Sequence, residues 1–327
     1  MEALYKSGML CNPLQAYTLR RVTVDEGRAR GTQVIEIATA GGLRLDLLPD
    51  NGLDIGAVHY RGVNMSWISK NGPDAPRCDL PYEMEFLNYF PGGLLYTGGL
   101  RSTGPANRDG DEWHPLHGRY HGLSAEQVCA RLEGDDIVVS GVIREAAFSG
   151  HVLELKREYR IPVFGAQIRL KDALTNLTPL PEEYSMLYHC NFGWPLVSPE
   201  AHVEFPAQRK TTPRTPFAAT GLGQEHTFSE PTPGEEERVF FHEEMERRVS
   251  IVNPAIDTRM TISWSDTLPI LSHWRRMACG DYVCGLEPSN TYIMGRSAER
   301  ENGTLPVLPP FETVRNEVCI AFGPAKA

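Results

Sequence analysis

The sequence lacks the features that mark membrane, secreted and nucleic-acid-binding proteins. None of its apolar runs approaches the about 18 residues that a membrane-spanning helix needs, and residues 1–8 have neither the basic start nor the apolar stretch of a signal peptide. Long basic runs are also missing, and the formal net charge of the 327 residues is −10. We therefore expect no nucleic-acid partner and no membrane surface. The composition favours a soluble, cytoplasmic protein that acts on a small molecule.

The cysteines lack the spacing of a disulfide framework or a thiolate zinc site. They are odd in number, they are scattered, and no C-x-x-C pair occurs. We expect reduced cysteines that serve as packing residues, namely Cys11, Cys78, Cys129, Cys190, Cys279, Cys284 and Cys319.

Long helical patterns are scarce, and short strand patterns take their place. The 25 prolines and 30 glycines are spread along the chain, as turns between many strands would require. Apart from one short turn near Leu222, no helix is predicted. The whole chain, residues 1–327, is therefore predicted to form one all-β domain, a sandwich of antiparallel strands. Alternation or apolar runs predict strands at 32–38, 43–48, 55–60, 63–68, 125–132, 136–145, 151–161, 165–176, 183–191, 238–241, 247–253, 259–264, 270–277, 282–286 and 313–322.

Two stretches show no strand periodicity. Residues 206–237 are rich in Pro, Thr, Gly and Glu and are predicted to form a long surface loop. Residues 70–122 combine glycine and proline with aromatic and charged side chains. A structureless stretch of that length in a compact domain is usually functional. The second stretch is therefore predicted to be a binding loop.

One acid and one imidazole stand out as candidate catalytic groups. Glu287 follows the short buried strand pattern Tyr282–Cys284, and Pro288 is predicted to end the strand directly after it. A carboxylate among apolar residues has a raised pKa, which suits a general base. His189 lies at the predicted end of strand 183–191, and the side chain of a histidine ordinarily titrates near neutrality. Together the two groups could give and take a proton.

Aromatic and polar side chains near these groups would suit a sugar. Trp194 and Trp274 offer flat faces for the C–H side of a sugar ring, and Arg and Asn side chains can bind its hydroxyls.

The order of four short motifs resembles the aldose 1-epimerase, or galactose mutarotase, superfamily. The motifs are Gly99–Arg101, His117–Gly118, His189–Phe192 and Leu286–Asn290. The resemblance implies a large antiparallel β-sandwich of the galactose mutarotase type (a supersandwich) and a sugar substrate. It implies no required cofactor. The sequence leaves the oligomeric state open, a homodimer included.

The resemblance also implies roles for individual residues. Glu287 would take the proton of the anomeric hydroxyl, and His189 would protonate the ring oxygen, so that the ring opens and recloses as the other anomer. Glu287 must then be ionised and His189 protonated, which requires the lower pKa to belong to Glu287. The expected substrate-binding residues are Arg101, His117, Arg119, Asn191 and Trp274.

Departures from the family pattern leave alternatives open. Arg101, Arg108 and Arg119 are close in sequence, and they suggest a divergent branch whose sugar is acidic or phosphorylated. A metal-dependent sugar isomerase could instead use the cluster formed by His114, His117 and His121 with Glu112. A carbohydrate-binding protein without catalysis would use the aromatic residues and arginines but would leave the Glu287 and His189 pair unexplained.

Overall fold

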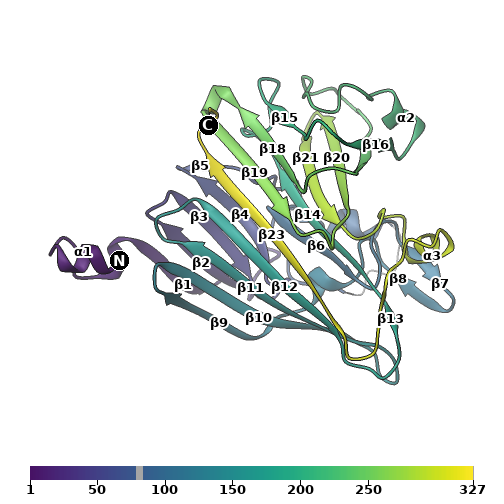
Figure 1. The fold of residues 1–327 in the computed structure, drawn as a ribbon, viewed down its shortest axis with the longest axis horizontal. Coiled ribbons are helices and arrows are strands. Elements are labelled where there is room, and N and C mark those ends of the chain that lie inside the picture. Colours follow the sequence, from purple (N-terminus) through teal and green to yellow (C-terminus); the bar gives the residue numbers. More distant parts are fainter. Residues whose placement is uncertain (79–83, 327) are drawn as a thin grey trace.

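Two large antiparallel sheets form the body of the protein in the computed structural model, which describes residues 1–78 and 84–326 (Figure 1). The expected sandwich of antiparallel strands is confirmed. Two short two-stranded pairs stand apart from the main sheets, β7 (Asn107–Asp109) with β8 (Glu112–His114) and β13 (Glu182–Glu183) with β22 (Val307–Leu308). In Figure 1, α1 and the β7–β8 pair lie at opposite ends of the long axis.

The first sheet has eleven strands and holds the candidate catalytic residues. Its order is β1, β2, β3, β4, β6, β14, β21, β20, β17 and β16, and β5 pairs with β4 outside this path. The strands span Tyr17–Thr23 (β1), Gln33–Thr39 (β2), Leu43–Leu48 (β3), Asp54–Tyr60 (β4), Val63–Asn64 (β5), Leu95–Leu100 (β6), Ser185–Phe192 (β14), Lys210–Pro213 (β16), Arg238–Glu243 (β17), Ile270–Ala278 (β20) and Asp281–Ser289 (β21).

The second sheet has eight strands in the order β15, β18, β19, β23, β12, β11, β10 and β9. They span Glu126–Glu133 (β9), Asp136–Ala146 (β10), Val152–Pro162 (β11), Gln167–Asn176 (β12), His202–Glu204 (β15), Arg248–Asn253 (β18), Thr258–Trp264 (β19) and Thr313–Gly323 (β23). The helices are short: α1 (Glu2–Lys6), α2 (Pro216–Ala219), α3 (Arg296–Glu301) and the 3-10 turns Pro13–Gln15, Glu85–Asn88, Tyr120–Gly122 and Pro254–Ile256. No helix in the described part of the chain is both long and apolar enough to cross a membrane.

The main core lies between the two sheets and explains the alternation seen in the sequence. On β12, Ile168 and Leu170 are buried while Arg169 and Lys171 are exposed, because one face of this strand meets the core and the other meets solvent. The central strands β14 and β21 differ. Every residue of β14 is buried, since the core covers one face and the elements around a cavity cover the other.

A buried charged cluster joins the two sheets. The guanidinium of Arg157 on β11 lies 2.6 Å from Asp54 on β4 and 2.8 Å from Asp172 on β12. Asp54 also accepts hydrogen bonds from the backbone N–H and hydroxyl of Thr97 on β6, and Tyr188 on β14 donates to Asp172. Such charges are tolerated in a core only when they are paired and hydrogen-bonded. Here they fix β6 and β14, the strands beside the candidate site.

Several local predictions were wrong. β21 continues through Pro288 to Ser289, and His189 lies inside β14, so neither candidate catalytic residue is at a strand end. The predicted loop 70–122 contains β6, a central strand of the larger sheet, and the predicted loop 206–237 contains β16 and α2. Residues 79–83 of the first loop lie outside the described residues. The strand expected at 63–68 is reduced to Val63–Asn64.

All seven cysteines are free, as expected, but only two are core residues. Cys190 and Cys284 are buried, whereas Cys11, Cys78, Cys129 and Cys279 are exposed and Cys319 is intermediate. The predicted role of the cysteines as packing residues therefore fits only Cys190 and Cys284, because the exposed thiols have little to pack against.

Candidate active site

The two candidate catalytic residues belong to one row of cross-strand neighbours on the larger sheet. Tyr96 on β6 pairs with His189 on β14. The pairs Leu187 with Ser289 and Cys190 with Leu286 place His189 opposite Glu287 on β21. Glu287 in turn pairs with Ser272 on β20. Directly opposed residues on antiparallel strands point to the same face, so strand register alone brings the imidazole and the carboxylate together.

His189 and Glu287 form a close buried pair. Nδ1 of His189 is 3.3 Å from Oε1 of Glu287, and the side chains are 6% and 1% exposed. These two facing atoms are sealed from solvent and have no hydrogen-bond partner within the described chain. Nε2 of His189 and Oε2 of Glu287 are not sealed in this way, which leaves them available to a ligand.

Burial makes the uncharged form of this pair the favoured one. It raises the pKa of Glu287 well above its ordinary value, a shift that Arg214 partly opposes. It also lowers the pKa of His189 to about 4, against a smaller opposing contribution from Asn191. The expected order, with the lower pKa on Glu287, is therefore reversed in the unliganded protein, because removal from water penalises both charged forms. In the unliganded protein the titrating proton of the pair is therefore favoured on Glu287 over His189.

Gly285 makes room for the carboxylate of Glu287. A Cβ atom added at Gly285 would lie 2.3 Å from Oε1 of Glu287 and 3.2 Å from Cβ of Trp274. No real side chain could occupy that position without displacing the carboxylate. The glycine two residues before Glu287 is thus part of the construction of the site.

His117 contributes a second imidazole from the loop before the 3-10 turn Tyr120–Gly122. Its backbone has a φ of 59°, a conformation that is uncommon for residues other than glycine. Its Nδ1 accepts a hydrogen bond from the backbone N–H of Gly104 at 3.2 Å, so the proton of the neutral ring is on Nε2. Burial lowers the pKa of His117 well below its usual value, and the nearby His189 and Arg214 add to that shift. His117 can therefore act as a neutral hydrogen-bond donor, and its ring centroid is 5.2 Å from that of His189.

A cavity of about 460 Å³ opens above these three residues. This volume lies in the range of small-molecule sites, roughly 300–1,000 Å³. Aromatic rings supply much of its wall: Trp274 and Phe90 stand 5.4 and 5.7 Å from the ring of His189. The lining consists of Trp67, Ser69, Lys70, Asn71, Phe86, Leu87, Phe90, Gly104, Pro105, Leu116, His117, His189, Arg214, Glu237, Val239, Trp274, Arg276, Asp281, Glu287 and Ile293.

Trp274 is held in place by a polar chain along the same wall. Its Nε1–H donates to Oε2 of Glu237 at 2.9 Å, and the other oxygen of Glu237 accepts from Arg214 at 2.5 Å. This hydrogen bond fixes the indole in the cavity wall. A rigid aromatic face beside a neutral acid and base suits the apolar side of a sugar ring.

Comparison with known proteins identifies the family. The family described as a domain of unknown function, DUF4432, matches residues 29–321, which is most of the chain. The chain belongs to the DUF4432 family. A search of curated proteins finds no match.

Solved structures show that this DUF4432 protein has the galactose mutarotase fold. A candidate aldose 1-epimerase from Klebsiella pneumoniae aligns with a TM-score of 0.88 and 22% identity, over 96% of this chain and 87% of that one. A galactose mutarotase-like protein from Clostridium acetobutylicum aligns with a TM-score of 0.65 and 17% identity, over 95% and 99%. Galactose 1-epimerase from Lactobacillus acidophilus aligns with a TM-score of 0.63 and 12% identity, over 94% and 99%. The resemblance seen in the four motifs is thus shown at the level of fold.

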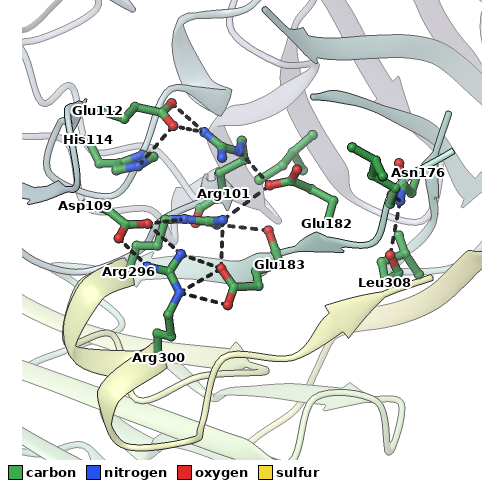
Figure 2. Close-up of polar contacts among 12 residues, drawn as sticks. Arg101, Asp109, Glu112, His114, Asn176, Glu182, Glu183, Arg296, Arg300 and Leu308 are labelled. Carbon is green, nitrogen blue, oxygen red and sulfur yellow. Dashed lines mark hydrogen bonds and ion pairs between the residues drawn. The ribbon is translucent and has the colours of Figure 1, made fainter. Parts of the chain in front are cut away.

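The structure of the DUF4432 chain places Arg101 and Arg119 outside the cavity wall. Arg101 donates to Glu182 at 2.9 Å and pairs with Glu112 (Figure 2). Arg119 donates to the backbone oxygen of Trp113 and lies 3.7 Å from Glu112. Both guanidinium groups are thus occupied by protein partners. Figure 2 shows the network around Arg101, which extends through Asp109, Glu183, Arg296 and Arg300.

Asn191 supports His189 from behind. It is fully buried and does not line the cavity. Its Nδ2 donates to the backbone oxygens of Gly93 at 3.1 Å and of His189 at 3.2 Å. This position allows it to hold the backbone of His189 but not to touch a ligand in the cavity. Trp194, the other aromatic residue suggested by the sequence, is largely exposed and is also absent from the wall.

The three histidines of the proposed metal cluster enter three different environments. His114 lies 3.7 Å from Glu112 at the edge of the ion-pair network, and His117 faces the cavity. His121 contacts Asp54 at 2.7 Å and stacks on Tyr96. Among the residues that the structure describes, no group of three or more His, Cys, Asp or Glu side chains is arranged to hold a metal ion.

The sequence reasoning missed most of the cavity wall. Arg214 and Glu237 come from the stretch predicted to be a surface loop, and Lys70 and Arg276 were not singled out. Strand register places Arg214: Val239 pairs with Trp274, which pairs with Gly285, and the N–H of Arg214 donates to the oxygen of Val239. That row runs directly beside the row that contains His189 and Glu287. Only pairing between distant strands reveals it.

Proposed function

We propose that this protein is a carbohydrate isomerase of the aldose 1-epimerase type, which interconverts the two anomers of a sugar. One observation carries the proposal: His189 and Glu287 face each other at 3.3 Å, sealed and unpartnered, at the floor of a monosaccharide-sized cavity. A purely structural pair would be expected to satisfy its buried polar atoms, because leaving them unpaired costs about 1–3 kcal/mol each. The shared fold with galactose 1-epimerase supports this assignment.

The proposed reaction moves one proton onto the sugar and removes another. Oε2 of Glu287 accepts the proton of the anomeric hydroxyl as the bond between the anomeric carbon and the ring oxygen breaks. Nε2 of His189 donates its proton to the ring oxygen, which gives the open-chain aldehyde. Rotation about the bond next to the carbonyl exposes its other face. Ring closure with the reverse proton transfers yields the second anomer and restores both side chains.

The neutral resting pair is compatible with these roles. The form with a protonated Glu287 and a neutral His189 holds the same number of protons as the form with an ionised Glu287 and a protonated His189. Proton transfer within the 3.3 Å pair therefore converts one into the other without changing net charge. A sugar hydroxyl that donates to the carboxylate favours the ionised form, since hydrogen bonding to a charged group stabilises it.

Other cavity residues would bind and orient the sugar. The N–H on Nε2 of His117 can donate to a ring or hydroxyl oxygen, and Arg214 and Glu237 can bind hydroxyls. Trp274 and Phe90 offer apolar faces to the C–H bonds of the ring. Together these groups would hold the anomeric carbon above the acid and base, where proximity supplies part of the rate.

The direct test is a panel of sugars examined by NMR exchange between anomers. Purified protein is expected to accelerate anomer exchange of at least one aldose well above the buffer rate. Binding of a sugar without acceleration would favour a carbohydrate-binding protein instead. If no sugar in the panel binds or exchanges, the proposal fails.

Treatment with a chelator separates this proposal from the metal-dependent alternative. Because the proposed chemistry uses only Glu287 and His189, exchange activity is expected to survive chelation. Loss of activity together with a stoichiometric divalent ion in elemental analysis would favour the metal-dependent isomerase.

A further inference from the structure

A small charged group lies in the cavity wall away from the catalytic pair. Nζ of Lys70 is 2.7 Å from Oδ2 of Asp281, and Nε of Arg276 is 3.8 Å from the same oxygen. All three residues line the cavity. Two cations therefore share one carboxylate oxygen, so the group carries a net charge of +1.

The remaining ionised pair in the wall does not offset this charge. Arg214 and Glu237 are paired one to one. The cavity thus keeps one surplus positive charge in a chain whose formal net charge is −10.

The guanidinium of Arg276 keeps hydrogen-bond donors for a partner in addition to its 3.8 Å ion pair with Asp281. In the described chain it makes no hydrogen bond, and its Nε is sealed without one. Its side chain is 39% exposed, so its outer nitrogens remain reachable from the cavity. A planar guanidinium with open donors matches carboxylate and phosphate oxygens well.

The position of Arg276 fits the far end of a sugar. It lies four residues beyond Ser272, the cross-strand partner of Glu287, and even spacing on a strand keeps both side chains on one face. Four residues correspond to about 13 Å along the strand, of which a long arginine side chain can span a part. The charged group is therefore remote from the anomeric carbon held at Glu287.

We propose that the substrate is a monosaccharide with a negatively charged group at the end remote from the anomeric carbon, and that Arg276 and Lys70 bind this group. The proposal names the substrate class for the site and rests on the proposed function for the placement of the anomeric carbon. It differs from the sequence expectation in its residues, because Arg101 and Arg119 are occupied outside the cavity.

The test compares equilibrium binding of matched neutral and anionic sugars by calorimetry. Galactose is compared with galacturonate, and glucose with glucose 6-phosphate. The two anionic probes separate a carboxylate from a phosphate as the preferred group. The wild-type protein is expected to bind at least one anionic sugar roughly tenfold more tightly than its neutral counterpart, and added salt should reduce this preference.

Two variants should move the preference in opposite directions. Arg276→Gln should lower the ratio of anionic to neutral affinity roughly tenfold, because it removes the guanidinium donors that would bind the anionic group. Asp281→Asn should raise the same ratio several-fold, because it releases Lys70 and Arg276 from their shared carboxylate. Arg248→Gln, which removes an exposed arginine on β18 of the other sheet, is the matched control and should leave the ratio unchanged.

Each outcome has one meaning for this site. An anionic preference that Arg276→Gln abolishes and Asp281→Asn strengthens supports it, even if no anomer exchange is detected. Equal binding of neutral and anionic sugars, or a preference that survives in Arg276→Gln, overturns it. In that case anomer exchange with a neutral sugar would leave the proposed epimerase function standing. If none of the four sugars binds, the proposal of an anionic site is also contradicted.

Discussion

His189 and Glu287 face each other across the neighbouring strands β14 and β21, with Nδ1 3.3 Å from Oε1. Their pKa values move in opposite directions for one reason, the loss of water around both groups. Between the His189 pKa of about 4 and the raised pKa of Glu287, the pair therefore holds a single titrating proton. This property links the geometry of the site to its expected pH dependence.

The first prediction is a broad, bell-shaped pH profile. Activity should fall when the pair gains a second proton, near the His189 pKa of about 4, and when it loses its only proton above the raised pKa of Glu287. Measurement of kcat/KM across the stable pH range checks both limbs. In His189→Asn, turnover should drop by about two to four orders of magnitude. A narrow optimum centred on the ordinary pKa of histidine would count against a desolvated pair.

The second prediction concerns Gly285. Gly285→Ala should push the Glu287 carboxylate out of position, because the new Cβ would lie 2.3 Å from Oε1. We expect kcat to fall by about tenfold or more, and the upper limb of the pH profile to move as the environment of Glu287 changes.

Gly323→Ala is the matched control for Gly285. Gly323 is also a strand glycine, at the end of β23, but a Cβ there would meet nothing within 4 Å. Both variants should be compared by activity and thermal unfolding. If Gly285→Ala keeps the wild-type kcat and pH profile, Gly285 does not position the carboxylate of Glu287.

The third prediction is that Arg101 stabilises the fold and does not bind the sugar. Arg101→Gln leaves Glu112 and Glu182 without their shared cation, at a cost of about 2 kcal/mol of unfolding free energy for this partly exposed cluster. KM for the sugar should stay nearly constant, since Arg101 does not line the cavity. Chemical denaturation and steady-state kinetics test the two halves. A large rise in KM with unchanged stability would restore Arg101 as a substrate-binding residue.

The fourth prediction is acid sensitivity from a buried imidazole outside the site. Burial lowers the pKa of His242 to about 3, whereas an unfolded histidine titrates near 6.5. The folded form therefore binds fewer protons than the unfolded form below pH 6.5, so stability is lost as pH falls from 6.5 toward 3. By pH 5 this loss should reach about 2 kcal/mol.

His242→Gln tests that contribution by removing the titrating ring. The variant should lose stability less steeply than wild type between pH 6.5 and 5, even if it starts from a lower value at neutral pH. His202→Gln, which removes a partly exposed imidazole on β15, serves as the control. Parallel stability curves for wild type and His242→Gln would contradict the prediction.

Much of the fold was predictable because one face of most strands meets solvent. The alternation of β12 and the apolar pattern of β11 identify them directly. β6 escaped detection because Leu95–Leu100 is buried throughout and contains Thr and Gly, which leaves no alternation to read. The prediction that Pro288 ends the strand was wrong for β21, and the reason is physical. Pro288 removes one possible ladder hydrogen bond, while Glu287 and Ser289 on either side remain paired with β20.

The candidate site was only partly predictable from the sequence. His189, His117 and Glu287 belong to short motifs that stand out by residue type. Arg276 and Asp281 resemble ordinary charged strand residues, and only the pairing of β20 with β21 places them in one cavity. Arg101 is the opposite case, a residue that the sequence singled out and that lies outside the cavity wall. Its neighbours in sequence suggested a ligand, whereas its neighbours in space are carboxylates of the protein itself.

Glu287→Gln provides the most direct test of the catalytic pair. Glutamine keeps the size of the side chain and much of its hydrogen bonding but cannot accept the proton of the anomeric hydroxyl. Anomer exchange should be measured by NMR alongside sugar affinity and thermal unfolding of the same variant. We expect a folded protein that binds sugar within a few-fold of wild type and loses about two to four orders of magnitude in turnover. A folded, sugar-binding Glu287→Gln protein that still exchanges anomers near the wild-type rate would contradict the assignment of Glu287 as the base.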